Sequence, residues 1–432
     1  MLNEPAINFT TKAIRFLLTG SLSKFKFYQP QTVRFPDVKR TGIYVHVPFC
    51  EQLCPYCPYN RYPHNEALEL EYIKAIKKEI YYYSKQFSDL EVESVYFGGG
   101  TPTIVSEGLV DIIGELRKDF NIIGPFCVES NPADLTFNKI SLLKENGVDC
   151  ISLGIQSFNP KFLELIGRKY SVEKIKEVLI WLEQAKFKTV NIDLMFALPG
   201  QSIQDLKEDL DIATSTFADQ ITAYPLFTFP YSSIGEYRKL KNVEMPKLSS
   251  RKKMYYFLYD YLIKKDYKRA SVWSFKKEAD THRYSSVTRE RYIGFGPGAG
   301  SFYGSLFTLN TFSVPDYISS FNKKGEAVAL QMSFSRRLSI LYDFYWRLYD
   351  TRIPKVRIVD GVNYRVADIK ALKLFLILAK ALDMVDEEEE AYILTKKGTF
   401  WIHLLQNYFL LRYINKIWSV AKCVPWPESI EF

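Results

Sequence analysis

Hydrophobic and polar positions along residues 41–227 follow two alternating periods, which predict strands and helices in turn. Six short apolar runs, rich in β-branched and aromatic residues, are typical of buried strands; they lie at 41–47, 93–99, 126–131, 149–155, 189–196 and 220–227. Amphipathic segments separate them and predict helices at 67–87, 107–120, 137–147, 171–185 and 202–217. Strands that alternate with helices favour parallel pairing, so the pattern predicts an α/β sheet. Periodicity alone fits an open sheet and a partial barrel equally well.

The flanking segments have a different pattern. Residues 6–27 mix Ile, Phe and Leu with basic residues and contain no acid, which fits an interfacial helix on anionic lipid or a helix packed on the barrel. Another helix is predicted at 249–268. Residues 398–427 are aromatic and apolar with sparse basic residues; a core helix is the default interpretation, and a lid over an apolar substrate or a membrane-facing surface is the alternative. His403 in this tail is expected to be packed or hydrogen-bonded rather than a ligand.

Composition places the chain among folded cytoplasmic proteins. Of its 432 residues 47% are hydrophobic and 25% charged, which suffices for one large core and a smaller lobe. The net charge of +8 is mild, and no nucleic-acid-binding motif is present. We find no export signal and no apolar run long enough to span a membrane. In the cytoplasm structural disulfides are rare, so clustered cysteines are expected to serve a metal or redox centre.

Half of the six cysteines lie in one short loop. Cys50, Cys54 and Cys57 have the spacing C-x3-C-x2-C, and Pro55 and Pro58 keep the segment from being a regular element. Three thiolates at this spacing can bind three irons of a 4Fe–4S cluster and leave the fourth iron without a protein ligand. A zinc site completed by a nearby histidine is the alternative, but no second Cys or His pair follows at a suitable distance. The spacing therefore favours the cluster.

The loop CEQLCPYC, with the aromatic Tyr56 before its last cysteine, resembles the cluster loop of the radical S-adenosylmethionine (SAM) superfamily. The wider phrase YVHVPFC resembles the branch of oxygen-independent coproporphyrinogen III oxidase, which also contains heme chaperones, anaerobic heme-degrading enzymes and radical methyltransferases. The resemblance implies a partial (β/α)6 barrel with a smaller helical C-terminal lobe, and SAM bound to the open iron. The expected domains are an N-terminal extension, the barrel, a flanking region and a helical lobe, at 1–40, 41–245, 246–329 and 330–432.

Polar residues at the carboxyl ends of the predicted strands are candidate ligand contacts, because functional groups of such barrels gather there. Gly98–Thr101 follow the second strand, where glycines let backbone N–H groups approach a carboxylate or phosphate. Glu129 ends the third strand, and Gln156 ends the fourth. Arg168 is expected on the helix that follows the fourth strand. Asp193 lies within an apolar strand, where a carboxylate is costly unless it is paired.

The resemblance assigns these residues to two SAM molecules. The positions that match contacts to the cluster-bound SAM are Tyr44, Tyr56, Gly99 and Glu129. Those that match a second SAM are Gly100, Thr101, Gln156, Arg168 and Asp193, with the Arg168 guanidinium suited to the second carboxylate. The glycine-rich segment 294–300 resembles a strand lining the SAM site; a turn packed against the barrel mouth is the plain alternative, and a dinucleotide-binding loop is disfavoured.

The resemblance leaves several reactions open, because members of this branch differ in what they do. Tyr59 stands where coproporphyrinogen oxidases of this branch usually carry a further cysteine, so decarboxylation is disfavoured. Gly300 stands where the heme chaperones carry a histidine, although CPYCPYNRY still resembles their cluster loop. The remaining expectation is a methyltransferase using two SAM molecules, with a quinone- or porphyrin-like acceptor, flavodoxin or ferredoxin as reductant, and peripheral membrane contact through its termini.

Overall fold

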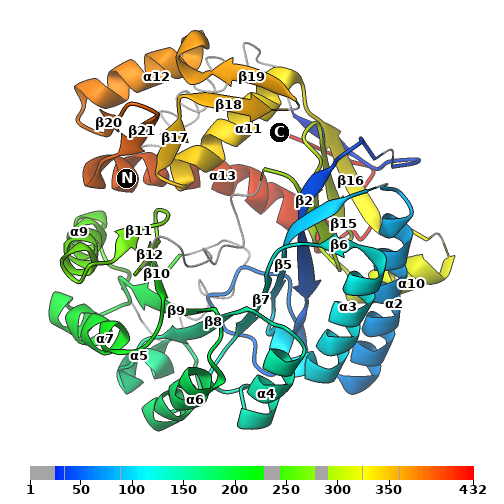
Figure 1. Cartoon of the computed structure of the whole chain (residues 1–432), viewed down its shortest axis with the longest axis horizontal. Helices are drawn as coiled ribbons and strands as arrows, with labels where there is room; N and C mark the ends of the chain where they lie inside the picture. Colours follow the sequence, from blue (N-terminus) through cyan, green and yellow to red (C-terminus); the bar gives the residue numbers. More distant parts are fainter. Residues whose placement is uncertain are drawn as a thin grey trace.

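The structure is a computed structural model, and it describes residues 25–33, 35–87, 89–227, 244–277, 290–323, 325–359 and 361–432. The helix expected within residues 6–27 therefore lies almost wholly outside the described residues. Figure 1 shows an α/β barrel with a smaller lobe above it, and the long helix α13 lies between the two. Within the described ranges, no helix combines the length and the apolar character needed to cross a membrane.

Six parallel strands form the barrel wall, as the alternating pattern predicts. In sequence order they are β2 (Arg40–Val47), β5 (Glu91–Gly99), β7 (Phe126–Ser130), β8 (Cys150–Gln156), β9 (Thr189–Phe196) and β10 (Gln220–Pro225). Each strand pairs in parallel with the next along the chain. The sheet continues beyond both β2 and β10 rather than closing on itself. The barrel is therefore partial, which the hydrophobic period alone could not establish.

The connecting helices cover the outside of this sheet (Figure 1). They are α2 (Glu66–Ser84), α3 (Ser106–Asp119), α4 (Phe137–Glu145), α5 (Pro160–Leu165), α6 (Val172–Ala185) and α7 (Ile203–Ser215). Their starts are set by local capping: Asn65 accepts the Leu68 N–H, and Ser202 forms a reciprocal capping box with Asp205. The six-residue helix α5 is the one barrel helix that the periodic pattern does not predict.

Further strands extend both edges of the barrel. Beside β10 lie β12 (Ser274–Lys276) and β11 (Lys268–Arg269), and helix α9 (Leu248–Lys264) precedes them. Beside β2 the sheet continues through β13 (Tyr292–Phe295), β14 (Gly300–Phe302), β15 (Leu306–Asn310), β16 (Val328–Ser333), β1 (Lys26–Tyr28) and β22 (Ser429–Glu431). Smaller elements are β3 (Phe49–Cys50), β4 (Tyr62–Pro63), β6 (Asn121–Ile122), η1 (Pro102–Val105) and α10 (Val314–Lys323).

The glycine-rich segment 294–300 forms the turn between β13 and β14. A Cβ on Gly296, whose φ is +98°, would lie 2.5 Å from the His46 carbonyl oxygen. Asn60 donates to the Pro297 carbonyl at 3.2 Å, and the Gly296 N–H donates to Glu79 at 2.8 Å. The turn packs behind the cysteine loop. The segment is therefore better described as a turn packed against the barrel mouth than as a strand lining the ligand site.

Glu79 of α2 is buried where this turn meets the barrel, and we predict that it makes stability depend on pH. Its carboxylate accepts from the Gly296 N–H, from Asn310 at 2.7 Å and from the Tyr317 hydroxyl. Burial raises its pKa from 4.5 to about 7. Because the folded state binds the proton more tightly, the stability contributed by Glu79 is present below pH 4.5 and is lost as pH rises through 7. Relative to Glu79→Gln, the wild type should lose roughly 2–3 kcal/mol between pH 5 and pH 8.

Chemical denaturation of both forms across this pH range measures the difference directly. A difference that stays constant from pH 5 to pH 8 would contradict the assignment, because glutamine fills the same space and does not titrate.

The C-terminal lobe has its own small core. Its helices are α11 (Arg336–Tyr349), α12 (Lys370–Ala381) and the long α13 (Lys396–Ala421), with the short helix η2 (Val366–Asp368). The lobe is less purely helical than expected, because it also contains β17 (Arg352–Pro354), β20 (Val385–Glu387) and β21 (Ala391–Leu394) in one sheet, and β18 (Val356–Val359) and β19 (Val362–Arg365) in another. Ile353, Leu372, Leu376 and Ile402 pack together in its core.

Candidate functional site

One cavity of about 940 Å³ lies between the barrel, the cysteine loop and the C-terminal helices. Eleven of the predicted site residues line it: Cys50, Cys54, Tyr56, Cys57, Gly99, Gly100, Thr101, Glu129, Gln156, Arg168 and Asp193. Tyr44 is not among the lining residues. Its hydroxyl lies 3.0 Å from His46 Nδ1, and its ring stacks on Tyr96 beside the cavity. The topology thus brings together residues that are up to 143 positions apart in the sequence, from Cys50 to Asp193.

The cysteine loop presents three free thiols to this cavity. Arg61 donates to the Cys54 carbonyl at 2.7 Å, and Gln52 donates to the Gly167 carbonyl at 2.7 Å, so the loop is anchored at two points. Burial, followed by the nearby Cys57 thiol, raises the pKa of Cys50 to about 12. Burial likewise raises the pKa of Cys57. Binding a metal centre here requires these thiols to lose their protons, which the positive charge of the metal favours.

The donor set fits an iron–sulfur cluster better than zinc. Among the described residues, no group of three or more His, Cys, Asp or Glu side chains is arranged to hold a metal ion. One zinc ion would draw its sulfur ligands to within about 4 Å of one another. A 4Fe–4S cluster instead takes each thiolate on a different iron, so it needs no such convergence. His64, which could have completed a zinc site, is engaged with Glu69 at 2.6 Å and Glu51 at 3.3 Å.

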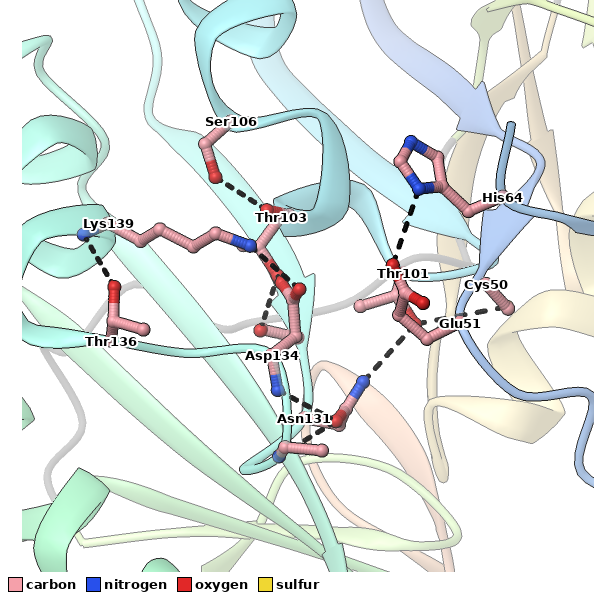
Figure 2. A network of polar contacts seen from close by, with 12 residues as sticks. Cys50, Glu51, His64, Thr101, Thr103, Ser106, Asn131, Asp134, Thr136 and Lys139 are labelled. Carbon is pink, nitrogen blue, oxygen red and sulfur yellow. Dashed lines mark hydrogen bonds and ion pairs between the residues drawn. The ribbon is translucent and has the colours of Figure 1, made fainter. Parts of the chain in front are cut away.

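A chain of polar contacts leads from the first cysteine into the cavity wall (Figure 2). The Thr101 hydroxyl donates to Cys50 Sγ at 3.8 Å, and Asn131 Nδ2 donates to Thr101 Oγ1 at 3.2 Å. Beyond Asn131, Asp134 accepts from Lys139 at 2.8 Å. Asn131, Asp134 and Lys139 all line the cavity. These three residues were not predicted as site residues, although Asn131 is the last residue of the predicted strand that contains Glu129.

The glycines after β5 make room for the cysteine loop. Gly99 has φ +110°, and a Cβ on Gly100 would lie 2.3 Å from the Phe49 carbonyl oxygen. The Gly100 N–H donates to the Val47 carbonyl at 2.8 Å and the Thr101 N–H to the Phe49 carbonyl at 2.7 Å. Both N–H groups are hydrogen-bonded to backbone carbonyls of the chain leading to Cys50. The expectation that they face a ligand is therefore wrong.

We predict that Gly100→Ala impairs both stability and cluster loading. The added methyl group must displace the Phe49 carbonyl and with it Cys50, at a cost of about 1–3 kcal/mol for a crowded core. Gly114→Ala is the matched control, because this glycine lies inside α3 with no atom within 4 Å of a new Cβ. Alanine there should stabilise by up to about 1 kcal/mol. Chemical denaturation and iron content measure both effects; equal iron content in the two variants would refute the prediction.

Two carboxylates occupy the middle of the cavity wall. Glu129 accepts from the Tyr96 hydroxyl at 2.5 Å and from the Gly99 N–H at 3.3 Å, and burial raises its pKa. Asp193 accepts from Ser152 Oγ at 2.9 Å and from Asn191 Nδ2 at 2.8 Å. Burial and then the charge of Glu129 raise the pKa of Asp193 to about 7. These two groups can therefore receive a ligand ammonium or ribose hydroxyl, and Asp193 can also hold a proton.

Asn191 is the residue that orients Asp193, and the sequence analysis missed it. Its amide donates to both Asp193 and Ser152, and its Oδ1 accepts from Thr222 at 2.8 Å. Asn191 and Asp193 lie two positions apart on β9, so their side chains face the same side of the sheet. The sequence offered one signal for this pair. Asn191 is a polar residue in an apolar strand, two positions before the suspected site residue Asp193.

The sequence had suggested that Arg168 lies on a helix. In the structure, Arg168 reaches the cavity from a loop instead. Helix α5 ends at Leu165, and Gly167 turns the chain with φ +76°. Arg168 Nε donates to the Tyr56 hydroxyl at 3.1 Å, and its guanidinium carbon lies 5.9 Å from the Tyr56 ring centroid. In the part of the chain that the structure describes, Arg168 forms no ion pair. Its charge is therefore available to an anionic ligand.

Gln156 ends β8 in an uncommon backbone conformation, which the packing around it must hold in place. Its φ is +73°, which is uncommon for a side chain of this kind. Asp209 of α7 pins the following turn, because it accepts from Ser157 Oγ at 2.8 Å and from the Phe158 N–H at 2.7 Å. Gln156 Oε1 accepts from the Tyr224 hydroxyl at 2.9 Å, which directs the amide along the cavity wall.

The far wall of the cavity comes from helices α11 and α13 of the C-terminal lobe and from Trp273 between β11 and β12, a grouping that the sequence did not predict. It is aromatic and apolar, with lining residues Trp273, Tyr345, Trp346, Tyr349, Leu410, Leu411 and Ile414. His403 of α13 also lines it; the ring lies 4.9 Å from Trp273, and Nε2 lies 3.0 Å from Asn407 Nδ2. Burial lowers the pKa of His403 to about 4, so the ring is neutral at pH 7. The expectation of a packed and hydrogen-bonded His403 is confirmed.

Comparison with known proteins agrees with this arrangement. A sequence profile described as the radical SAM superfamily matches residues 44–213. The heme chaperone HemW of Bacillus subtilis is 32% identical over 291 residues, which is 65% of this chain and 76% of that protein. The oxygen-independent coproporphyrinogen III oxidase of Escherichia coli is 24% identical over 389 residues, 85% of each chain.

Among solved structures, the Escherichia coli coproporphyrinogen III oxidase HemN, described as a radical SAM enzyme, superposes with a TM-score of 0.71. The match covers 89% of this chain and 90% of that chain at 21% identity, which establishes the shared fold. Membership of this family implies a 4Fe–4S cluster and SAM, and the three cavity-facing thiols fit such a cluster. The chain belongs to the radical SAM superfamily and is a radical SAM enzyme of the type represented by HemN and HemW.

Proposed function

We propose that this enzyme binds two SAM molecules in its cavity and methylates an sp2 carbon of a flat, largely apolar small molecule. The observation that carries the proposal is Arg168, whose guanidinium faces the cavity without an ion pair among the described residues. A charge held away from bulk water is costly unless an anion accompanies it. The planar fork of arginine suits a carboxylate, and SAM carries one on its methionine part.

The positions of the other polar groups support two ligand sites. Tyr56, Gly99 and Glu129, which the resemblance assigns to the cluster-bound SAM, line the cavity together with the three cysteines proposed to hold the cluster, and Tyr44 lies beside it. Gln156, Arg168 and Asp193 come from the next two strands and the loop between them, where a second ligand would bind. The Glu129 and Asp193 carboxylates can pair with the ammonium or ribose groups of such ligands, and Arg168 can bind the second carboxylate.

The far wall supports the proposed substrate class. Trp273, Trp346 and Tyr349 present ring surfaces to the cavity, and Leu410 and Leu411 add aliphatic surface. Such walls bind flat apolar molecules through ring contacts and area burial, as quinones and porphyrins would allow. The C-terminal helix would then act as the cover over the substrate that the sequence offered as one alternative for residues 398–427.

The proposed reaction balances without an oxidant. When bound, the cluster supplies the electron for reductive cleavage of the first SAM. Overall, the substrate exchanges one C–H bond for a C–CH3 bond, and two SAM molecules and two electrons are consumed. The other products are S-adenosylhomocysteine, methionine and 5′-deoxyadenosine, and there is no net uptake of protons. A reduced flavodoxin or ferredoxin is the electron donor that we propose.

A second candidate function is that of a heme chaperone. It is favoured by the similarity to HemW of Bacillus subtilis, which has the higher identity of the two relatives described above. Heme is flat and largely apolar, so the same aromatic wall could hold it. Decarboxylation of a coproporphyrinogen-like substrate is a further alternative, supported by the similarity to the oxidase over more of the chain.

Turnover with SAM that carries a trideuterated methyl group distinguishes these functions. The enzyme is reconstituted anaerobically, and products are followed by mass spectrometry with a strong reductant and quinone or porphyrin acceptors. For methyl transfer we expect equal amounts of 5′-deoxyadenosine and S-adenosylhomocysteine, with one deuterium in the 5′-deoxyadenosine. Unlabelled 5′-deoxyadenosine without S-adenosylhomocysteine would overturn methylation. Retained heme without SAM cleavage would instead establish the chaperone.

A further inference from the structure

Helix α12 has two apolar faces, of which the described residues cover only one. Leu372, Leu376 and Ala379 are buried in the core of the C-terminal lobe. On the opposite side, four large aliphatic side chains remain 46–54% exposed: Leu374, Ile377, Leu378 and Leu382. Their spacing of three, one and four residues places them in one stripe along the helix and its end. We call these four residues the α12 stripe.

The α12 stripe is more than scattered surface hydrophobicity. Single exposed aliphatic residues are normal on a protein surface, whereas a contiguous stripe on one helix marks an interaction site. Figure 1 shows α12 at the outer edge of the lobe, on the side away from the barrel. The stripe is therefore remote from the cavity and plays no part in the proposed reaction.

Charges are ordered along the same helix. Lys370 and Lys373 lie in the first turn, and both are exposed. The chain beyond the last turn carries the acidic residues Asp383, Asp386, Glu387, Glu388, Glu389 and Glu390. Lys380 of the last turn contacts Glu387, so this acidic hairpin lies beside the C-terminal end of the helix. Lys355 also pairs with Glu387 and Arg352 with Glu388, so Asp383, Asp386, Glu389 and Glu390 are the hairpin acids without an ion pair among the described residues. The surface still runs from basic through apolar to acidic.

We propose that the α12 stripe is a dimer interface, occupied by the same stripe of a second copy of this chain in antiparallel orientation. A two-fold axis near the middle of the stripe places the basic start of each helix opposite the acidic hairpin of the other, while the aliphatic side chains pack together. An anionic membrane fits less well, because the acidic hairpin at one end would be repelled by the lipid headgroups. The charge order therefore favours self-association.

The size of the interface sets the strength to be expected. A helix of twelve residues is about 18 Å long, and contacts smaller than the standard interface are usually weak. We expect a dissociation constant in the micromolar range for the full-length protein. Sedimentation velocity between about 1 and 100 µM should show a monomer–dimer equilibrium within this range.

Ile377→Glu should weaken this association at least about 100-fold, because it buries an unpaired charge at the centre of the contact. Ile180→Glu is the matched control: Ile180 is also 54% exposed but lies on α6 of the barrel. A protein that is monomeric up to 100 µM, or a dimer that both variants weaken equally, would overturn the proposal.

Oxidative cross-linking tests the orientation in a Cys423→Ser background. Ile377→Cys should cross-link to itself, whereas Lys370→Cys should cross-link only when mixed with Leu382→Cys. Efficient self-cross-linking of Lys370→Cys would indicate a parallel contact and would contradict the antiparallel arrangement. Flotation of monomeric protein with phosphatidylglycerol vesicles, lost in Ile377→Glu, would assign the stripe to a membrane instead.

Discussion

Cys54→Ala should abolish reductive SAM cleavage, with a fall in 5′-deoxyadenosine formation of at least about 1000-fold. Cys54 is buried at the cavity wall, and it is one of only three thiols there. Two thiolates cannot hold the cluster as three do, because each thiolate binds one iron. Iron and sulfide content, the brown absorbance and product formation measure the effect together.

Cys423→Ser is the control for this variant, because Cys423 is exposed and is not among the residues that line the cavity. It should keep iron content and SAM cleavage at the wild-type level. Far-ultraviolet circular dichroism of both variants should match the wild type, since neither side chain belongs to the main core. A Cys54→Ala protein that retains a full cluster would disprove the assignment of the cysteine loop.

Arg168→Met should reduce the formation of S-adenosylhomocysteine at least about 30-fold while SAM cleavage at the cluster continues. Methionine keeps most of the length of the side chain but removes the charge and the donor fork. Loss of one partner of a desolvated charged hydrogen-bonded pair costs about 2–5 kcal/mol, which corresponds to this factor. The ratio of S-adenosylhomocysteine to 5′-deoxyadenosine should therefore fall sharply from one.

Lys176→Met provides the matched control, because Lys176 is an exposed cation on α6 at the outside of the barrel. Arg168→Lys should recover only part of the lost activity, since an ammonium keeps the charge without the planar fork. If Arg168→Met lowers both products equally, Arg168 supports the first SAM or the loop itself, and the second SAM site would have to be abandoned.

The barrel could be predicted from the sequence because its strands are buried on both faces. Residues 189–196 form a continuous apolar run broken only by polar residues of the site, and the observed strand has the same bounds. Parallel strands of this kind and amphipathic helices leave a strong local pattern. The six-residue α5 and the hairpin of β18 and β19 leave almost none, because such short elements depend on the packing around them.

The cysteine loop was predictable because its chemistry is local, with three thiols inside eight residues. The rest of the cavity depends on distant contacts. Arg168 was assigned to a helix although Gly167, directly before it, is a residue type that commonly ends helices, and in the structure α5 ends at Leu165. The glycine N–H groups were assigned to a ligand because the sequence does not show that the chain before Cys50 occupies them. The far wall, with the aromatic residues of α11, Trp273 and the aliphatic residues of α13, needed the full topology.

The cavity is assembled from three separate stretches of the gene, at residues 50–227, 271–274 and 345–414. The barrel provides the cysteines and carboxylates within residues 50–193, whereas the aromatic wall comes largely from residues 345–414. Mutations in residues 345–414 can therefore change which molecule fits without touching the groups proposed to hold SAM. A lineage could acquire a new substrate by altering this one wall while it inherits the radical chemistry intact, and exchanging α11 and α13 between relatives is the corresponding route for redesign.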